Sequence, residues 1–506
     1  MTTSARRHVA VVLLWCALAA ACTGVKKNGG STDLSIGNQS TDTTVAATDP
    51  GAGDVTEPAD TTAAPDPAAP ETEGGAAAGG GAGARGSAPT ATKAPAPSGA
   101  GGASTSPSGG TASTPVDAPG DPQLFSGAAN THGITPTTIT LCGHAALTYG
   151  PAFNATADDF NVYYSAVNDA GGIHGRKVVA TYENDNYEAD TARQAADACR
   201  GKKPFAILGG IGFDQIPSVR NWAEANKELY LHHIATEVGA GDKKYSFTTQ
   251  PSVEQVGRAF GELVASRYPG KKVGALYRDS EFWQPGFNAF KQVAAARGIN
   301  LVKAVPVQKN QANYTQALIE LRNAGAEVAW AWENTLALTQ IVKQAKAQNY
   351  SPQWVAFPFN LTSQTLDNDA LTPPMVGLSS WPGYSFGDYG DTFAPYANDM
   401  KEFEAQYRKY RPNTDISGVA GDLLWLNWIE QKRLVELLRA CGPNCTRNHF
   451  AGLLVNGYKA TTSPTCPLDF SRGNNGSGGF VNLLETFRSP SGKVNWKSTA
   501  LCKTGF

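Results

Sequence analysis

Histidines and cysteines could bind a metal ion, and two short groupings of them stand out. His232 and His233 are adjacent near the end of an expected strand. Adjacent strand residues point to opposite faces, so we expect them not to share a metal ion. Cys441 and Cys445 have only His449 near them, so a disulfide is favoured over the alternative of a metal site. We therefore expect neither a metal nor a cofactor.

Catalytic motifs do not assign an activity to the chain. It contains no P-loop and no His-Glu-x-x-His. The glycines at 209, 210 and 212 are followed by Gln215, where a dinucleotide-binding motif requires Gly. Because no pair of nucleophile and base can be named, we expect that the protein is not an enzyme.

Length and composition exclude further classes. The chain has 506 residues, with 42 Lys plus Arg against 44 Asp plus Glu, so its net charge is −2. This balance leaves no basic excess for binding nucleic acid. No window reaches the roughly 20 apolar residues of a membrane-spanning helix, which excludes a polytopic membrane protein.

Residues 1–21 are typical of a signal peptide. A short basic start precedes thirteen apolar residues from Val9 to Ala21, a length that suits export and is too short to span a bilayer. Small residues before Cys22 resemble the bacterial lipobox, although Ala19 stands where that motif usually has Leu. We expect a lipid on Cys22 that anchors the exported protein to the outer face of the cell membrane. The alternative is a secretory peptide with an unmodified Cys22.

Residues 22–133 are predicted to form a disordered tether rich in Ala, Gly, Pro, Ser and Thr. From Gly37 to Gln123 there is no Leu, Ile, Met or aromatic residue. Such a segment cannot bury enough apolar area to offset a backbone ordering cost of about 1–2 kcal/mol per residue.

From about residue 134 the pattern alternates between expected strands and helices. Apolar strands at 139–142, 177–180 and 205–210 are separated by helical spacing, and the alternation returns at 273–277 and 328–330. Strand–helix alternation predicts mostly parallel sheets flanked by helices. The length exceeds one typical core, so we expect an α/β protein with two lobes.

Six cysteines remain once Cys16 in the leader and Cys22 are set aside, and an even number suits an oxidising compartment. The six permit fifteen pairings. The favoured set is Cys142–Cys199, between the first strand and a nearby helix, then Cys441–Cys445 across a Pro-Asn turn, then Cys466–Cys502.

Four segments together resemble the type I periplasmic solute-binding proteins, the branched-chain amino-acid-binding (Leu/Ile/Val) group of ABC importers. They are Ala170-Gly-Gly-Ile-His-Gly-Arg-Lys177, Ala206-Ile-Leu-Gly-Gly210, Tyr277-Arg-Asp-Ser-Glu-Phe-Trp283 and Ala312-Asn-Tyr-Thr-Gln-Ala317. The resemblance implies two α/β lobes joined by three crossover segments. Lobe 1 would comprise 134–250 and 378–455, and lobe 2 would comprise 251–377 and 456–506.

In lobe 1, the resemblance places ligand contacts after the strands. The family's serine that holds a ligand carboxylate falls on Phe213, its threonine falls on Thr236, and its backbone contact falls on Ile234. Asp214 is the acid next to this set, and Tyr149 completes it.

In lobe 2, the family's aromatic before a helix falls on Phe282 or Trp283, and its tyrosine near the ligand falls on Asn334. Its glutamate that pairs with a ligand ammonium falls on Pro358, so the usual partner is missing. Asp214 and Glu333 could substitute for it, or their side chains could face solvent.

Aromatic residues gather around the same loops: Phe213, Phe282, Trp283, Trp332, Phe357 and Phe359. Aromatic faces suit planar or apolar ligands, and ordinary core packing is the alternative. Trp330 and Trp332 alternate along an expected strand, so both should face one side. The loss of the ammonium partner predicts a neutral or acidic, partly aromatic or apolar ligand rather than Leu, Ile or Val.

The resemblance implies a binding protein that captures a small molecule, an amino acid or a related metabolite, and delivers it to the permease of an ABC importer. Its expected partners are the ligand, the permease subunits and the membrane through the lipid. The alternative is an envelope ligand sensor or interaction protein of the same fold. By the same resemblance His144 lies near the cleft, with a solvated loop histidine as the alternative.

Overall fold

The computed structural model describes most of the chain from residue 115 onwards. Every described residue belongs to one compact unit within residues 100–506. The described residues are 115–149, 153–210, 212, 214–232, 243–281, 283–308, 311–333, 335–356, 373–384, 386–387, 394–417, 419–460, 466–472, 476, 481–490, 492 and 494–503. Within these ranges no helix combines the length and the apolar character needed to cross a membrane.

The first sheet has five strands in the order β4-β1-β5-β6-β7, all parallel. Their bounds are β1 (Thr138–Ala145), β4 (Lys177–Asn184), β5 (Ala206–Leu208), β6 (Tyr230–His232) and β7 (Ser246–Thr248). A short hairpin of β2 (Thr148–Tyr149) and β3 (Phe153–Asn154) follows β1.

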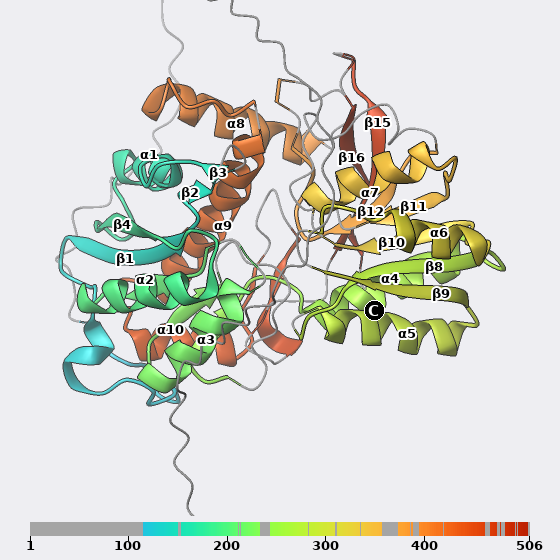
Figure 1. Ribbon diagram of the computed structural model, residues 1–506. Helices are drawn as coiled ribbons and strands as arrows, with labels where there is room; N and C mark the ends of the chain where they lie inside the picture. The colour runs from blue at the N-terminus through green and yellow to red at the C-terminus, as the bar shows by residue number, and fades with distance from the viewer. Residues whose placement is uncertain are drawn as a thin grey trace, which may run out of the picture. The chain divides into compact units, whose positions relative to one another are not determined.

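Helices cover both faces of the first sheet (Figure 1). On one face, apolar residues of α2 and α3 meet Cys142, Ile207 and Tyr230 of the sheet. On the other face, Leu141 and Leu208 belong to a core shared with α1, α9 and α10. The helix bounds are α1 (Val162–Asp169), α2 (Ala189–Gly201), α3 (Gln215–Asn226), α8 (Ala394–Tyr410), α9 (Val419–Cys441) and α10 (Arg447–Val455).

The second sheet has seven strands in the order β16-β15-β12-β11-β10-β8-β9. Five are parallel, and β15 and β16 extend the sheet beyond β12 as antiparallel strands, with β16 at the edge. The bounds are β8 (Lys272–Arg278), β9 (Asn300–Val307), β10 (Val328–Trp332), β11 (Gln353–Ala356), β12 (Val376–Ser379), β15 (Val481–Arg488) and β16 (Val494–Lys503). These strands and helices confirm the predicted mixed α/β class.

Alternation along β10 assigns its two faces to different helix pairs. Trp330 and Trp332 pack with residues of α4 (Val253–Arg267) and α5 (Gln284–Arg297). Ala329 and Ala331 pack instead with α6 (Thr315–Asn323) and α7 (Thr335–Ala347). The two tryptophans therefore share one face, as predicted, and both are fully buried core residues.

Local signals define the ends of these helices. Ser252 accepts a hydrogen bond from the backbone N–H of Gln255, whose side chain caps Ser252 in return, so α4 begins with a capping box. Helix α5 ends at Gly298, whose φ of +67° suits glycine and lets its N–H bond the carbonyl of Ala294.

The chain passes between the two sheets three times: after β7, after β12, and before β15. Two of these positions differ from the predicted lobe boundaries. Strand β12 belongs to the second sheet, so the second passage follows Ser379. Residues 456–460 and 468–472 stay with the first sheet's helices, because η5 (Phe470–Arg472) contacts α10 and the N–H of Phe470 bonds the carbonyl of Tyr458.

Glu430 on α9 connects the first two passages. Its carboxylate accepts hydrogen bonds from Thr249 Oγ1 (2.5 Å) and Gln250 Nε2 (2.5 Å), which directly follow β7. It also accepts one from Trp381 Nε1 (3.0 Å), which follows β12, and one from Arg433 Nη1 (2.8 Å). Burial raises the pKa of Glu430, and Arg433 opposes that effect only in part.

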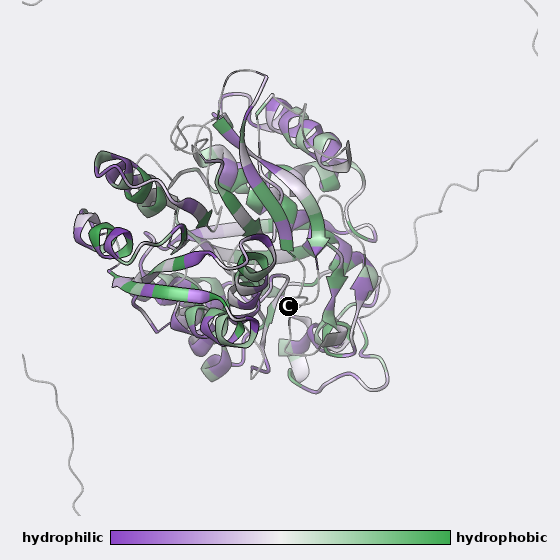
Figure 2. Ribbon diagram, turned by 90° about the vertical axis from the view of Figure 1, so that its right-hand side faces the viewer, coloured by the Kyte–Doolittle hydropathy of each residue, from purple (hydrophilic) through white to green (hydrophobic). Residues whose placement is uncertain are grey.

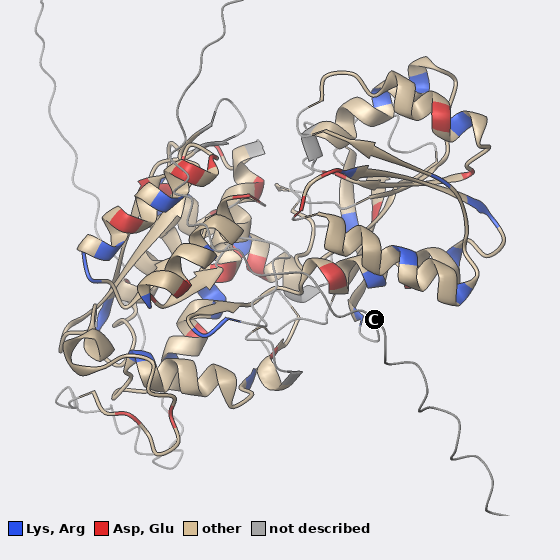
Figure 3. Cartoon of the chain, turned by 60° about the horizontal axis from the view of Figure 1, so that its bottom comes forward, with Lys and Arg blue, Asp and Glu red and all other residues tan. Residues whose placement is uncertain are grey.

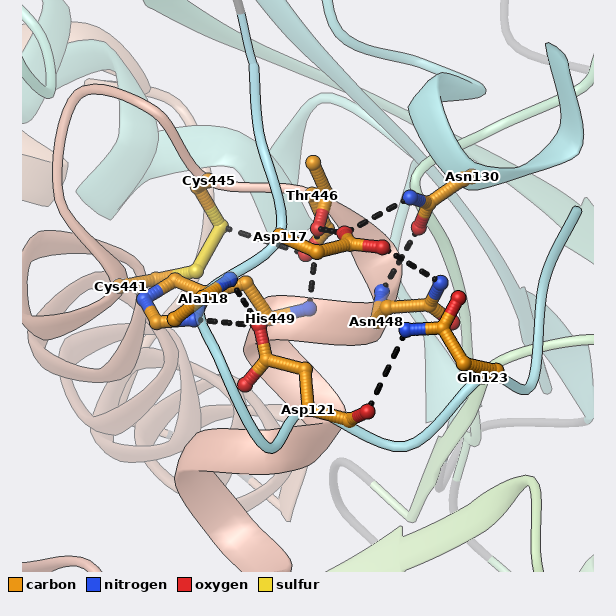
Figure 4. Close-up of polar contacts among 10 residues, drawn as sticks. All are labelled: Asp117, Ala118, Asp121, Gln123, Asn130, Cys441, Cys445, Thr446, Asn448 and His449. Atoms are coloured by element: carbon orange, nitrogen blue, oxygen red, sulfur yellow. Dashed lines mark hydrogen bonds and ion pairs between the residues drawn. A yellow bond between two sulfur atoms is a disulfide. The ribbon is translucent and has the colours of Figure 1, made fainter. Parts of the chain in front are cut away.

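Residues 115–126, the N-terminal strap, lie on α10 and correct the predicted start of the fold at 134 (Figure 4). Asp117 accepts hydrogen bonds from Asn130 Nδ2 (2.8 Å), Asn448 Nδ2 (3.0 Å) and the Thr446 hydroxyl. Asn448 Oδ1 in turn accepts the N–H of Phe125 (2.8 Å). The composition argument missed this segment because polar side chains, rather than apolar burial, hold most of it in place.

Two of the three expected disulfides are present. Cys142 is bonded to Cys199 between β1 and α2, and Cys441 is bonded to Cys445 at the end of α9. Cys466 and Cys502 are not joined, contrary to the expected third pair. They lie beside each other at Asn482, whose Oδ1 contacts Cys466 Sγ (3.5 Å) and the N–H of Cys502 (3.1 Å).

The helices in Figure 2 carry both hydrophilic and hydrophobic stretches, as helices with one buried face do. Figure 3 shows Lys and Arg interspersed with Asp and Glu over helices and loops.

Candidate functional site

Open parallel sheets bind ligands beyond the carboxyl ends of their strands. At this end of the first sheet lie His144, Asp185 and Gln215, and they are joined by the hydroxyl of Tyr230, which begins β6 and reaches His144; we call these four residues the first edge. At the corresponding end of the second sheet lie Arg278, Trp283, Tyr314 and Glu333, which we call the second edge.

A buried hydrogen-bonded chain forms the base of the first edge. His144 Nδ1 lies 2.8 Å from Asp185 Oδ2, and His144 Nε2 lies 2.8 Å from Tyr230 Oη. Burial raises the pKa of Tyr230 well above its usual range, and the charge of Asp185 adds to the effect. The phenol therefore keeps its proton, so it can donate to Nε2 while Nδ1–H donates to Asp185. All three residues are fully buried, so His144 is not the solvated loop histidine of the alternative interpretation.

The turn after β4 adopts an unusual backbone conformation beside this chain. Asn186 and Tyr187 have φ values of +50° and +60°, in the left-handed region that non-glycine residues rarely occupy. Asp185 Oδ1 accepts the N–H of Tyr187 (2.9 Å), and Asn184 binds Thr148 Oγ1 (2.6 Å) in the hairpin after β1. Such strain persists where surrounding contacts hold it, and it is frequent at ligand sites.

The turn between β5 and α3 requires glycine for close approach. A Cβ on Gly210 would lie 2.3 Å from the carbonyl oxygen of His144, and one on Gly212 would lie 1.9 Å from Gln215 Oε1. Gly210 therefore packs directly against the backbone of His144.

Gln215 is the first residue of α3, and its side-chain amide makes no hydrogen bond to the described residues. Its side chain is 1% exposed, and neither Oε1 nor Nε2 has a hydrogen-bond partner among the described residues. A buried polar group without a partner is unfavourable. The free N–H groups at a helix N-terminus also favour an anion or another oxygen-rich group. The first edge is thus equipped to bind a ligand oxygen.

A buried ion pair forms the second edge. Arg278 ends β8 and Glu333 follows β10, the neighbouring strand. Arg278 Nε donates to Glu333 Oε1 (3.0 Å), and Nη2 lies 2.7 Å from Oε2, so the guanidinium contacts both carboxylate oxygens, one of them through a hydrogen bond. Glu333 is neither solvated nor an unpaired carboxylate.

Trp283 supports this pair from the N-cap position of α5. The guanidinium carbon of Arg278 lies 4.8 Å from the centroid of the indole. The Trp283 and Trp332 rings meet edge to face at 5.0 Å, and Trp332 Nε1 donates to the Trp283 carbonyl (3.1 Å). Trp283 is fully buried, so it is part of the core rather than an exposed stacking surface.

Tyr314, at the N-cap of α6, completes the second edge. It is fully buried, and its hydroxyl has no hydrogen-bond partner among the described residues. Burial raises the pKa of Tyr314 to about 12, and the charge of Glu333 adds to the effect. The phenol is therefore a neutral donor and acceptor beside a neutralised ion pair.

The remaining residues of the expected site are only partly covered. Asp214 takes the N-cap position of α3 and is partly buried, and the backbone of Tyr149 lies in β2. The expected contacts that fall outside the described residues, together with the expected lipidation site, are Phe213, Ile234, Thr236, Phe282, Asn334, Pro358 and Cys22.

Five residues of the two edges escaped the sequence analysis: Asp185, Gln215, Tyr230, Arg278 and Tyr314. Asp185 and Arg278 stand at strand ends, a signal that was available, whereas the unused groups of Gln215 and Tyr314 appear only in the packed fold. A Gly383-x-Ser385-x-Gly387 pattern, the spacing of a nucleophile elbow, was also overlooked. It falls between Ser379, which ends β12, and Ala394, which begins α8, and its Ser385 lies outside the described residues.

A small cavity between β6–β7 and α9–α10 has room for about one water molecule. Its lining includes His232, whose ring lies 5.1 Å from that of Tyr230 in the first edge. No group of three or more metal-ligating side chains occurs within the described ranges.

The family model for periplasmic binding proteins matches residues 134–478. Among curated proteins, the Leu/Ile/Val-binding protein homolog 8 of Brucella abortus is 26% identical over 265 residues, which are 50% of this chain and 59% of the relative. The chain thus spans less than two thirds of the length of that relative.

Solved structures of similar fold cover most of the chain. A fatty acid ABC transporter substrate-binding protein from Thermomonospora curvata aligns with a TM-score of 0.59 and 15% identity, over 74% of this chain and 95% of its own. A solute-binding protein from R. palustris in complex with 4-hydroxybenzoate has a TM-score of 0.59 and 14% identity, over 72% and 97% of the two chains. A branched-chain amino acid ABC transporter protein from Thermus thermophilus with bound valine has a TM-score of 0.56 and 15% identity, over 73% and 97%.

The fold, the position of the two edges and the family match agree with one another. The match covers more than half of the chain, and the structural likeness extends over nearly the whole length of each solved neighbour. The chain belongs to the periplasmic binding protein family, as a type I member of the branched-chain amino-acid-binding group.

Proposed function

We propose that this protein is a surface-anchored lipoprotein that captures a small molecule between the two edges and delivers it to the permease of an ABC importer. Membership of a solute-binding family supports capture rather than catalysis. The single observation that carries the proposal is Gln215, a buried amide at the start of α3 that has no hydrogen-bond partner among the described residues. Each such buried polar group calls for an explanation, and in a solute-binding fold a bound ligand is the partner that we propose for it.

The proposed ligand is an amino acid or a related metabolite with an apolar or aromatic body. Solved neighbours hold 4-hydroxybenzoate and valine, so this fold accommodates small carboxylates with and without an ammonium group. The proposed contacts in lobe 1 are Gln215 of the first edge together with Asp214, Phe213, Ile234 and Thr236. Tyr149, Phe282, Asn334 and Pro358 remain candidate contacts.

A thermal-shift screen of small metabolites tests capture. A ligand at 100 times its dissociation constant should raise the free energy of unfolding by about 2.7 kcal/mol. If no compound in a broad screen shifts the transition, capture is contradicted.

Uptake of the identified ligand by cells with and without the gene tests delivery. Loss of uptake in the deletion strain is expected, whereas binding without any loss of uptake would support the sensor role instead. Membrane fractionation of a Cys22→Ala variant tests the anchor, since the variant should leave the membrane fraction.

A further inference from the structure

The second-sheet body, residues 253–379 and 481–503, contains few buried charges. Among its described residues, Arg278 and Glu333 are the only buried charged side chains, at 2% and 0% exposure. The other acids after β8, Asp279 and Glu281, are exposed. Any buried carboxylate that this edge offers to a ligand must therefore come from Glu333, as far as the described residues extend.

Arg278 already occupies that carboxylate. Its guanidinium contacts both oxygens of Glu333, at 3.0 Å and 2.7 Å, so the pair has no net charge. The indole of Trp283 lies against the guanidinium and holds it in this orientation. A planar guanidinium bound at two points and stacked on an aromatic ring is not easily displaced by a monovalent ammonium.

We propose that Arg278 determines ligand specificity: by neutralising Glu333, it leaves the second edge without a carboxylate for an ammonium group, so the site takes carboxylic acids that lack an amine. This inference rests on the proposed function, because it concerns the same ligand site. A zwitterionic amino acid would bring a buried ammonium against a neutral pair, and an unpaired buried charge is strongly disfavoured.

The two edges together define the ligand class. The first edge supplies donors to an oxygen-rich group through Gln215 and the beginning of α3. The second edge supplies the neutral phenol of Tyr314 and a charge-balanced pair. A monocarboxylate with an apolar or aromatic body that carries at most a neutral polar group matches both edges.

Matched probes that differ only in the ammonium group test this inference. The pairs are 3-phenylpropanoate with phenylalanine and 4-methylpentanoate with leucine, titrated calorimetrically into the purified full-length chain. The wild type should prefer the acid of at least one pair by tenfold or more. Arg278→Met should free the Glu333 carboxylate and raise the affinity for the corresponding amino acid at least tenfold.

Two control variants separate specificity from loosened packing. Arg297→Met removes an arginine that pairs with Glu262 at 3.2 Å on the surface, and it should leave the preference unchanged. The double variant Arg278→Met/Glu333→Gln removes the carboxylate as well, so it should show no gain in amino acid affinity. An equal gain in the double variant would overturn the inference.

The remaining outcomes are also decisive. If Arg278→Met does not fold, Glu333→Gln serves instead: it keeps the arginine, so amino acids should stay excluded and the acids should bind at least as well. A wild type that binds the amino acid as tightly as the acid overturns the role of Arg278 while supporting capture itself. If neither these probes nor the metabolite screen yields a ligand, the proposed function fails and the specificity inference with it.

Discussion

The two edges differ in whether their buried polar groups have partners within the protein. The first edge contains a hydrogen-bonded chain, Asp185–His144–Tyr230, and an amide, that of Gln215, with no partner among the residues that the structure describes. The second edge closes its charges on themselves through Arg278 and Glu333. The first edge thus keeps a polar group that can bind a ligand, whereas the charged groups of the second edge are already paired with each other.

This difference suggests a division of labour. Unused donors on a rigid base can bind the oxygen atoms of a ligand directly, because their positions are set before the ligand arrives. A neutralised pair contributes little attraction of its own and instead excludes groups that need a counter-charge. The first edge would then supply affinity, and the second edge would supply selectivity.

The largest expected effect on the free energy of unfolding distinguishes the buried Arg278–Glu333 pair from an ordinary surface ion pair. Arg278→Met should lower the free energy of unfolding by about 3–5 kcal/mol, because it leaves Glu333 buried without its partner. Arg297→Met, at a pair whose arginine is 54% exposed, should change it by less than about 1 kcal/mol. Urea denaturation of both variants measures these two changes. Equal changes in the free energy of unfolding would show that Arg278 and Glu333 do not form a buried ion pair.

Trp283→Ala tests whether the tryptophan is core or ligand surface. Loss of a fully buried indole should lower the free energy of unfolding by about 3–5 kcal/mol. If the variant is as stable as the wild type and only ligand affinity falls, Trp283 is a stacking surface after all.

A matched pair of phenols compares the edges directly. Tyr230→Phe removes the donor to His144 Nε2 and should destabilise the protein by about 1–3 kcal/mol. Tyr314→Phe removes a hydroxyl that has no partner among the described residues, so its effect at neutral pH should be close to zero. Thermal denaturation of the two variants should rank them in this order, and the reverse ranking would break the comparison.

Alkaline titration adds the pH dependence of the second edge. The pKa of Tyr314 is raised to about 12 in the folded state, against about 10 for an unperturbed tyrosine. The folded state therefore binds more protons than the unfolded state between these values, so stability is intact below about pH 10 and falls as the pH rises through about 12. Tyr314→Phe should flatten this fall, and an unchanged slope would contradict the assignment.

The smallest expected effect concerns the unused amide. Gln215→Ala should weaken binding of the acid identified in the screen by about 0.5–1.5 kcal/mol, the usual contribution of one hydrogen bond, with little loss of stability. Gln215→Glu should weaken binding further, because a carboxylate would repel the acid. Calorimetry of both variants checks this, and unchanged affinity in both would remove Gln215 from the site.

Much of the fold was predictable because its signals are local. The apolar run of β10 and the alternation of Trp330 with Trp332 follow from periodicity alone. The fold of residues 115–126 was not predictable, because Asp117 and Asn448 are more than 300 residues apart in the sequence.

The site was less predictable than the fold, for a physical reason. Family alignment pointed to Glu333 but could not show that Arg278 neutralises it, since that pairing depends on two strands meeting in register. In the same way, the missing partners of Gln215 are a property of three-dimensional packing. Residue type predicts which hydrogen bonds and ion pairs a side chain can form. Only the fold shows whether those interactions are already made within the protein.

The most direct test of the division between the edges is a crystal structure of the protein with the acid that gives the largest thermal shift. The account predicts that the ligand carboxylate contacts Gln215 Nε2 and the first backbone N–H groups of α3, with Arg278 still bound to Glu333. A ligand carboxylate bound to Arg278, with Glu333 displaced and Gln215 unoccupied, would contradict it.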